Sequence, residues 1–127
     1  MNESKFVLDS NVVIDFVKGA LGDGPLMRLP VNGKLYVSVI TRIESFAFQN
    51  LSPDEDRQIR LLLKILKVVP LTKKVEKNTI LIRASTKRKL PDSIIAATAV
   101  SLGATLISRD PHMLKLDWPG LPVISSI

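Results

Sequence analysis

The sequence contains no cysteine, few aromatic residues and no long apolar run. The absence of cysteine excludes disulfide bridges and thiolate metal sites, and it suits a reducing compartment. No apolar stretch approaches the roughly 20 residues that a membrane-spanning helix needs, and the N-terminal MNESKFVLD lacks the pattern of a signal peptide. With four Phe, one Tyr and one Trp, a platform for stacking bases is not the evident strategy. We therefore expect a soluble, cytoplasmic protein that does not associate with a membrane.

The length and the charge balance narrow the class of protein further. A chain of 127 residues fits a single domain, which we place over residues 1–127. It carries 18 Lys and Arg against 12 Asp and Glu, a formal net charge of +6. A domain this basic favours polyanions such as nucleic acid, or an acidic protein partner.

Short β-branched runs alternate with helical patterns along the chain. We expect strands over 5–9, 35–39, 68–71, 104–108 and 121–127, and helices over 11–18, 39 onward, 53–67, 72–89 and 91–103. The stretch LGDGPLMRLPVNG between the first helix and the second strand is rich in Gly and Pro and reads as a loop. Alternating strands and helices predict an α/β fold, a three-layer α/β/α sandwich with a mainly parallel central sheet.

Several helix ends have recognisable capping residues. Ser38 is a plausible N-cap for the second helix. Ser52 followed by Pro53 and three acidic residues is a strong start signal for the third. Gly103 is the expected stop of the helix that contains IIAATA.

Four carboxylates fall where a parallel sheet collects its working residues, at the carboxyl ends of the strands. These are Asp9, Glu44, Asp92 and Asp110. Each also has a purely structural interpretation: Asp92 could complement a helix dipole, Asp110 could begin a turn before Pro111, and Glu44 could be solvated. The joint placement at one edge of the sheet favours a shared site.

Four like charges in one cleft repel strongly, so a cluster of this kind needs cations. Oxygen ligands alone favour Mg²⁺ or Mn²⁺, and two such ions can activate a water and stabilise the leaving oxygen of a phosphodiester. Without these four acids, 18 basic side chains face 8 acidic ones, a balance of +10. An acidic pocket in a basic remainder suits an enzyme that acts on nucleic acid.

The segments VLDSNVVID, SVITRIESF, LPDSIIAATAVSLGATLISRD and LPVI resemble PIN-domain ribonucleases in order and spacing. The resemblance extends over nearly the whole chain and is greatest for the small toxins of VapBC-type toxin–antitoxin pairs. It implies a Mg²⁺- or Mn²⁺-dependent endoribonuclease that hydrolyses RNA, a cognate antitoxin and a homodimer. It also implies catalytic and metal-binding roles for Asp9, Glu44, Asp92 and Asp110, with Asn11 and Ser108 as supporting polar residues.

Other polar residues are candidates with weaker claims. Arg109 could contact the scissile phosphate or form a surface ion pair, and Asp15 could support the site or lie on the surface. His112, the only histidine, is not needed as a base beside a metal-activated water. The basic residues that could contact an RNA backbone, or form a solvated helix face, are Lys73, Lys74, Lys87, Arg88 and Lys89.

Alternative functions belong to other classes. A phosphatase with an aspartyl nucleophile would need an acid two residues after Asp9, and Asn11 cannot transfer a proton. A receiver domain would need an acidic pair near the end of the first strand, where only Glu3 and Asp9 are available. A non-catalytic module that binds RNA or protein is the stronger rival, and a housekeeping PIN ribonuclease would share the same chemistry.

Overall fold

The computed structural model describes residues 4–125. Five parallel strands form one sheet in the order β3-β2-β1-β4-β5. Their bounds are Lys5–Leu8 for β1, Lys34–Ser38 for β2, Lys67–Val69 for β3, Thr105–Ser108 for β4 and Val123–Ser125 for β5. The predicted parallel sheet is confirmed, although residues 126 and 127 of the last predicted strand lie outside the described residues.

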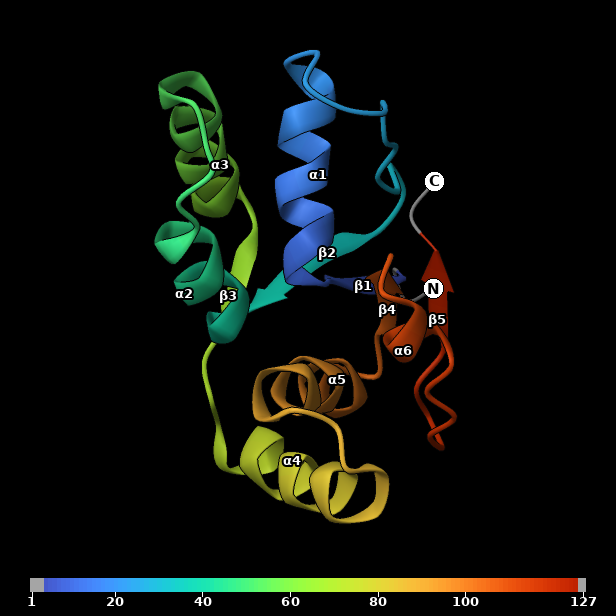
Figure 1. The fold of residues 1–127 in the computed structure, drawn as a ribbon. Helices are drawn as coiled ribbons and strands as arrows, with labels where there is room; N and C mark the ends of the chain where they lie inside the picture. The colour runs from blue at the N-terminus through green and yellow to red at the C-terminus, as the bar shows by residue number, and fades with distance from the viewer. Residues whose placement is uncertain (1–3, 126–127) are drawn as a thin grey trace.

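Helices cover both faces of this sheet (Figure 1). Their bounds are Ser10–Ala20 for α1, Val39–Ala47 for α2, Pro53–Ile65 for α3, Lys73–Thr86 for α4, Leu90–Leu102 for α5 and Pro111–Leu114 for α6. α1, α2 and α3 lie on one side of the sheet, and α4 and α5 lie on the other. The structure therefore has the predicted α/β/α layers.

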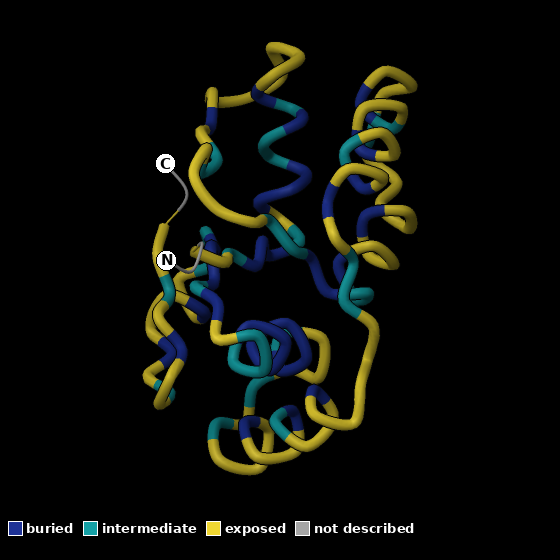
Figure 2. The backbone as a smooth tube through the Cα atoms, turned by 180° about the vertical axis from the view of Figure 1, so that it is seen from behind, coloured by how far each residue is buried: buried dark blue, intermediate teal, exposed yellow. Residues whose placement is uncertain are grey.

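Two buried clusters pack against the two faces of the sheet. Val7 and Leu106 contribute to the cluster under α4 and α5. Their neighbours in sequence, Leu8 and Ile107, point the other way and join the cluster under α1 and α3. Because both faces are covered, the central strands are apolar at consecutive positions rather than at alternate ones. Helix α5 is buried along most of its length between the sheet and α4 (Figure 2).

The predicted helix caps are present. The Ser38 hydroxyl accepts a hydrogen bond from the Ile40 amide at 3.0 Å. Ser52 and Glu55 form a reciprocal capping box at the start of α3. α5 ends at Gly103, whose φ of 64° is the left-handed conformation that glycine adopts without strain.

Two details of the region after α4 differ from the sequence prediction. The helix predicted over 72–89 ends at Thr86, because the backbone of Lys87 takes the left-handed conformation, at a φ of 57°, and a separate helix begins at Leu90. The short helix α6 was not predicted, since its four residues are too few to show a periodicity. Within residues 4–125 no helix combines the length and the apolar character needed to cross a membrane.

Candidate active site

Two of the predicted acids follow adjacent strands, and the other two lie on helices that pack against the sheet. Asp9 follows β1, and Asp110 comes two residues after β4, which is paired with β1. Glu44 is on α2, the helix that leaves β2 on the other side of β1. Asp92 is in the first turn of α5, which packs against β1 and β4. The parallel topology thus directs all four toward one edge of the sheet.

Asp9 is the most enclosed of the four, with 5% of its surface exposed. Its amide donates to the carbonyl of Ile107 at 2.9 Å, which continues the pairing of β1 with β4. Its two carboxylate oxygens accept hydrogen bonds from the Ser10 amide at 2.8 Å and from the Ser108 hydroxyl at 2.7 Å. Asp9 is also the N-cap of α1, so the positive end of that helix faces its carboxylate.

Ser108 connects two of the acidic positions. Its buried hydroxyl donates to Asp9 and accepts from the backbone amide of Asp110 at 3.0 Å. The carboxylate of Asp110 then accepts from the amide of His112 at 3.0 Å and so caps α6. Ser108, the last residue of β4, therefore fixes the backbone of Asp110 relative to the side chain of Asp9.

Ser10 makes the corresponding connection to Glu44, and the sequence analysis did not select it. Its hydroxyl donates to a Glu44 carboxylate oxygen at 2.6 Å and lies 3.1 Å from the Thr41 hydroxyl. Thr41 and Glu44 are three residues apart on α2, so they share the face that meets α1. In the sequence, the only sign of this role is that Ser10 directly follows Asp9, at the point where the first strand has ended and a helix begins.

The carboxylates are close enough to affect one another's ionisation. Burial raises the pKa of Asp9 to about 6 from its ordinary value of 3.8; the hydrogen bonds from Ser108 and Ser10 oppose the rise, and the charges of Asp92 and Asp110 add to it.

The pKa of Asp92 is also raised, chiefly by burial and then by the charges of Asp110 and Glu44. The cations of Lys89 and Arg88 act in the opposite direction on this pKa. The charges of Glu44, Asp92 and Asp110 thus each raise the pKa of at least one other predicted acid.

The donor set of this site fits a hard divalent cation that keeps much of its water. All the candidate ligands are carboxylate oxygens, and their mutual repulsion is what a cation would relieve. Among residues 4–125, no three side chains of Asp, Glu, His or Cys are close enough to form a complete protein cage. Mg²⁺ commonly binds through one or two carboxylates plus water and substrate phosphate, so this spacing is compatible with it.

A cleft of about 330 Å³ opens beside two of the acids. Asp92 and Asp110 form its acidic side, and His112 is at its edge. The remaining lining residues are Thr86 at the end of α4 and the three residues of the turn between α4 and α5, Lys87, Arg88 and Lys89. Asp9 and Glu44 are not part of this lining, so the cleft leads to the acidic edge and does not enclose it.

The other predicted polar residues have different surroundings. Asn11 is exposed in the first turn of α1. Arg109 forms an ion pair with Asp15, at 3.1 Å between Nη1 and Oδ2. This ion pair holds α1 to the end of β4, immediately beside the acidic edge.

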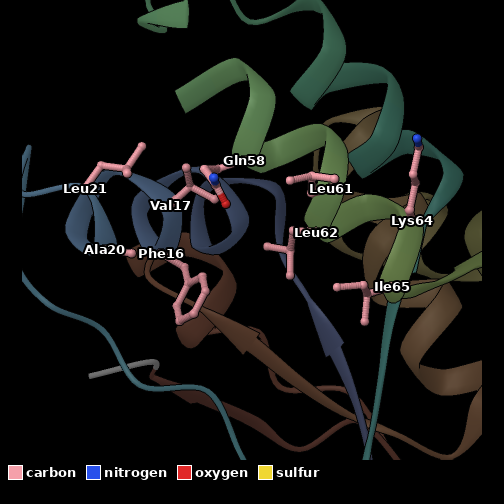
Figure 3. Close-up of a pocket in the computed structure, with 9 residues that line it drawn as sticks. All are labelled: Phe16, Val17, Ala20, Leu21, Gln58, Leu61, Leu62, Lys64 and Ile65. Atoms are coloured by element: carbon pink, nitrogen blue, oxygen red, sulfur yellow. The ribbon is translucent and has the colours of Figure 1, made fainter. Parts of the chain in front are cut away.

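A second concave surface lies between α1 and α3, away from the acids. Figure 3 shows its lining side chains, which are mostly apolar, and its volume is about 430 Å³. Several of them are well exposed, among them Leu61 at 47% and Ile65 at 79%. We call this surface the apolar groove; it is lined by Phe16, Val17, Ala20, Leu21, Gln58, Leu61, Leu62, Lys64 and Ile65.

Solved structures with this fold include several toxin–antitoxin complexes. A chain of a toxin–antitoxin complex from Klebsiella pneumoniae is 26% identical, with a TM-score of 0.68 over 91% of this chain and 93% of that one. A chain of VapBC2 from Rickettsia felis, bound to a DNA fragment from its promoter, is 14% identical, with a TM-score of 0.74 over 95% and 98%. A chain of FitAcB from Neisseria gonorrhoeae is 21% identical, with a TM-score of 0.65 over 93% and 95%.

The family of this chain follows from a comparison of its sequence with known families. None of the curated proteins matches the chain. The sequence pattern of the PIN domain family matches this chain over residues 6–119. This range runs from β1 to the segment before β5 and includes all four acids. The sequence resemblance is therefore confirmed at the level of the family, and the chain belongs to the PIN domain family.

Proposed function

We propose that the protein is a divalent-metal-dependent endoribonuclease that hydrolyses RNA phosphodiester bonds. The observation that carries this proposal is the convergence of Asp9, Glu44, Asp92 and Asp110 on one sheet edge, where burial and mutual repulsion raise the pKa of two of them. Such an arrangement opposes folding unless a cation compensates for it. The basic remainder of the chain suits a polyanionic substrate.

In this proposal the four acids are the catalytic and metal-binding residues, and the ion is Mg²⁺ or Mn²⁺. When bound, the metal supplies activation of a water and stabilisation of the leaving oxygen. Ser108 and Ser10 hold the carboxylates of Asp9 and Glu44 through their hydroxyl groups, so that little reorganisation is needed during the reaction.

We assign supporting roles to two further residues. Arg109 can contact a phosphate through the guanidinium N–H groups that its ion pair with Asp15 leaves free. Asn11 can offer its exposed amide to the substrate from the first turn of α1.

The test is cleavage of a labelled single-stranded RNA by the purified protein. We expect cleavage with Mg²⁺ or Mn²⁺, none in excess chelator, and none by Asp92→Asn with either metal. Asp54→Asn is the matched control, because Asp54 is in an exposed ion pair with Arg57 on α3 and its loss should leave cleavage unchanged. Cleavage that persists in chelator would remove the metal mechanism.

A non-catalytic PIN-fold module for RNA or protein is the main alternative. It would bind RNA without cutting it, with or without metal, and Asp92→Asn would bind no worse than wild type. A housekeeping PIN ribonuclease would cleave in the same way but would have no small partner protein.

We also propose that the protein is the toxin of a type II toxin–antitoxin pair, acts in the cytoplasm and forms a homodimer. Support comes from the structural matches, which include complexes of this kind, and from the apolar groove, which would suit the apolar face of an antitoxin helix. Light scattering should give a species of twice 14.0 kDa, and a 14.0 kDa species at high concentration would contradict the dimer.

The antitoxin proposal can be tested with any small protein that is encoded next to this chain. We expect it to co-purify with wild type and with Ile80→Lys, which alters an exposed apolar residue on α4. It should be lost from Ile65→Lys, which places a charge in the apolar groove. Retention of the partner by Ile65→Lys would show that this groove is not its docking surface.

A further inference from the structure

The turn between α4 and α5 carries three consecutive cations beside the acidic cleft. We call Lys87, Arg88 and Lys89 the basic turn; all three line the cleft that Asp92 and Asp110 also line. Lys89 and Arg88 lower the pKa of Asp92, so the charges of these two residues reach the acidic edge. The proposed metal site is thus flanked by positive charge on one side.

Lys87 has a backbone conformation that its side chain disfavours. It is the C-cap of α4 with a φ of 57°, and it is the only non-glycine residue of positive φ within residues 4–125. The equivalent position after α5 is Gly103, at a φ of 64°. A side chain in this region costs about 1 kcal/mol relative to glycine. Strain of this kind often accompanies function, so the lysine side chain calls for a role of its own.

Arg88 fixes the turn in place. Its Nη2 donates to the carbonyl of His112 at 2.7 Å, which ties the turn to α6. Its own carbonyl accepts from Arg83 Nη1 at 3.1 Å and from the Ser93 hydroxyl at 3.4 Å, which ties the turn to α4 and α5. These bonds use the Arg88 carbonyl and one guanidinium nitrogen, while the buried Nε has no hydrogen-bond partner. Because they tie the turn to α4, α5 and α6, Arg88 acts as a positioning residue.

The side chains of Lys87 and Lys89, on either side of Arg88, are not held in this way. Both are exposed, and none of the ion pairs within the described part of the chain includes either of them. A lysine ammonium on a flexible stem is a suitable partner for a phosphate group. The anchored arginine therefore sets two free cations at the rim of the cleft.

We propose that Lys87 and Lys89 bind backbone phosphates of single-stranded RNA next to the bond that is cut, and that Arg88 positions them. This inference rests on the proposed function for its substrate class, and it assigns a direction to the substrate path: from the acidic edge over the turn between α4 and α5.

Binding of a fluorescein-labelled 15-nucleotide single-stranded RNA of mixed sequence, followed by anisotropy in chelator over a range of KCl, tests the inference without cleavage. The variant is Lys87→Asn, because asparagine tolerates the left-handed conformation and has no charge. The matched control is Lys77→Gln, which removes a lysine charge from an exposed position on α4 outside the cleft lining.

We expect Lys87→Asn to bind about tenfold more weakly at low salt. Its slope of log affinity against log salt should be shallower by about 0.7, as for the loss of one phosphate contact to a single strand. Lys77→Gln should match wild type in both quantities. The melting temperature of Lys87→Asn should equal or exceed that of wild type, since the substitution eases the strain.

The outcomes separate this inference from the proposed function. If wild type cleaves RNA but Lys87→Asn keeps the wild-type salt slope, the basic turn is a surface feature and the nuclease proposal stands. If wild type never cleaves but the slope changes for Lys87→Asn alone, the phosphate contact stands and the nuclease proposal falls. Equal losses in Lys87→Asn and Lys77→Gln, or no binding by wild type, would overturn the inference.

Discussion

Replacing Asp9 by asparagine should stabilise the metal-free protein at neutral pH while removing its proposed activity. In the unfolded chain the pKa of this carboxyl is near 3.8, and in the folded protein burial raises the pKa of Asp9 to about 6. The folded state therefore binds the Asp9 proton more tightly than the unfolded state does. The contribution of Asp9 to stability is complete below pH 3.8 and is lost as the pH rises through 6.

The size of the effect follows from the shift. A difference of about two pKa units corresponds to roughly 3 kcal/mol over the full range, and about 2 kcal/mol of it falls between pH 4.5 and pH 8. An asparagine side chain has nearly the same shape as aspartate and no charge. The free energy of unfolding of Asp9→Asn should therefore not fall in this way as the pH rises. The repulsion between Asp9 and Asp92 is one of the causes of the raised pKa of Asp9, so it is already contained in this figure.

The assay is urea unfolding of both proteins in chelator at pH 4.5 and pH 8. The free energy of unfolding of wild type, relative to Asp9→Asn, should fall by about 2 kcal/mol between the two pH values. Asp54→Asn, which alters an exposed acid on α3, should stay close to wild type at both. If the free energies of unfolding of wild type and Asp9→Asn change equally with pH, ionisation of Asp9 does not destabilise the folded protein. The argument for a cation at this edge would then lose its basis.

Three further outcomes are expected. Mg²⁺ at about 100 times its dissociation constant should stabilise wild type by roughly 3 kcal/mol in thermal melts and Asp92→Asn by much less; equal shifts would make Asp92 a structural residue only. Ser108→Ala should cost about 1–3 kcal/mol in urea unfolding and reduce cleavage, because it removes a buried donor to Asp9, and an unchanged rate would show that Ser108 does not position it. Gly19→Ala should cost about 1–3 kcal/mol, because an added Cβ would lie 2.2 Å from the Pro25 carbonyl oxygen; wild-type stability would show that the loop moves aside easily.

Much of the fold could be predicted because its signals are local. Capping by Ser38 and Ser52 depends on residues within three positions, and the stop at Gly103 depends on one residue's conformation. The alternation of strands and helices then leaves few topologies with a covered parallel sheet. The end of α4 was harder, since a lysine is not a usual stop signal and the left-handed conformation of Lys87 cannot be recognised from the sequence.

The acidic residues of the candidate site could be predicted from the sequence, but the hydrogen bonds and the ion pair around them could not. The topology rule places Asp9 and Asp110 at one edge because each follows a strand. The contact of Ser10 with Glu44 joins residues 34 positions apart, and the ion pair of Arg109 with Asp15 joins residues 94 positions apart. Such pairs depend on how α1 packs against α2 and β4, which no local pattern determines.

The two serines suggest how the chain keeps four acids near one another without metal. The Ser108 hydroxyl donates a hydrogen bond to the Asp9 carboxylate and accepts one from the backbone N–H of Asp110, so one hydroxyl contacts two acidic positions. The Ser10 hydroxyl donates a hydrogen bond to Glu44, and the Ser10 amide donates one to Asp9. The two bonds to the Asp9 carboxylate favour its ionised form, yet the pKa of Asp9 stays raised because burial outweighs them. The hydrogen bonds therefore fix geometry without neutralising the charge, and the remaining repulsion is available to drive the binding of a cation.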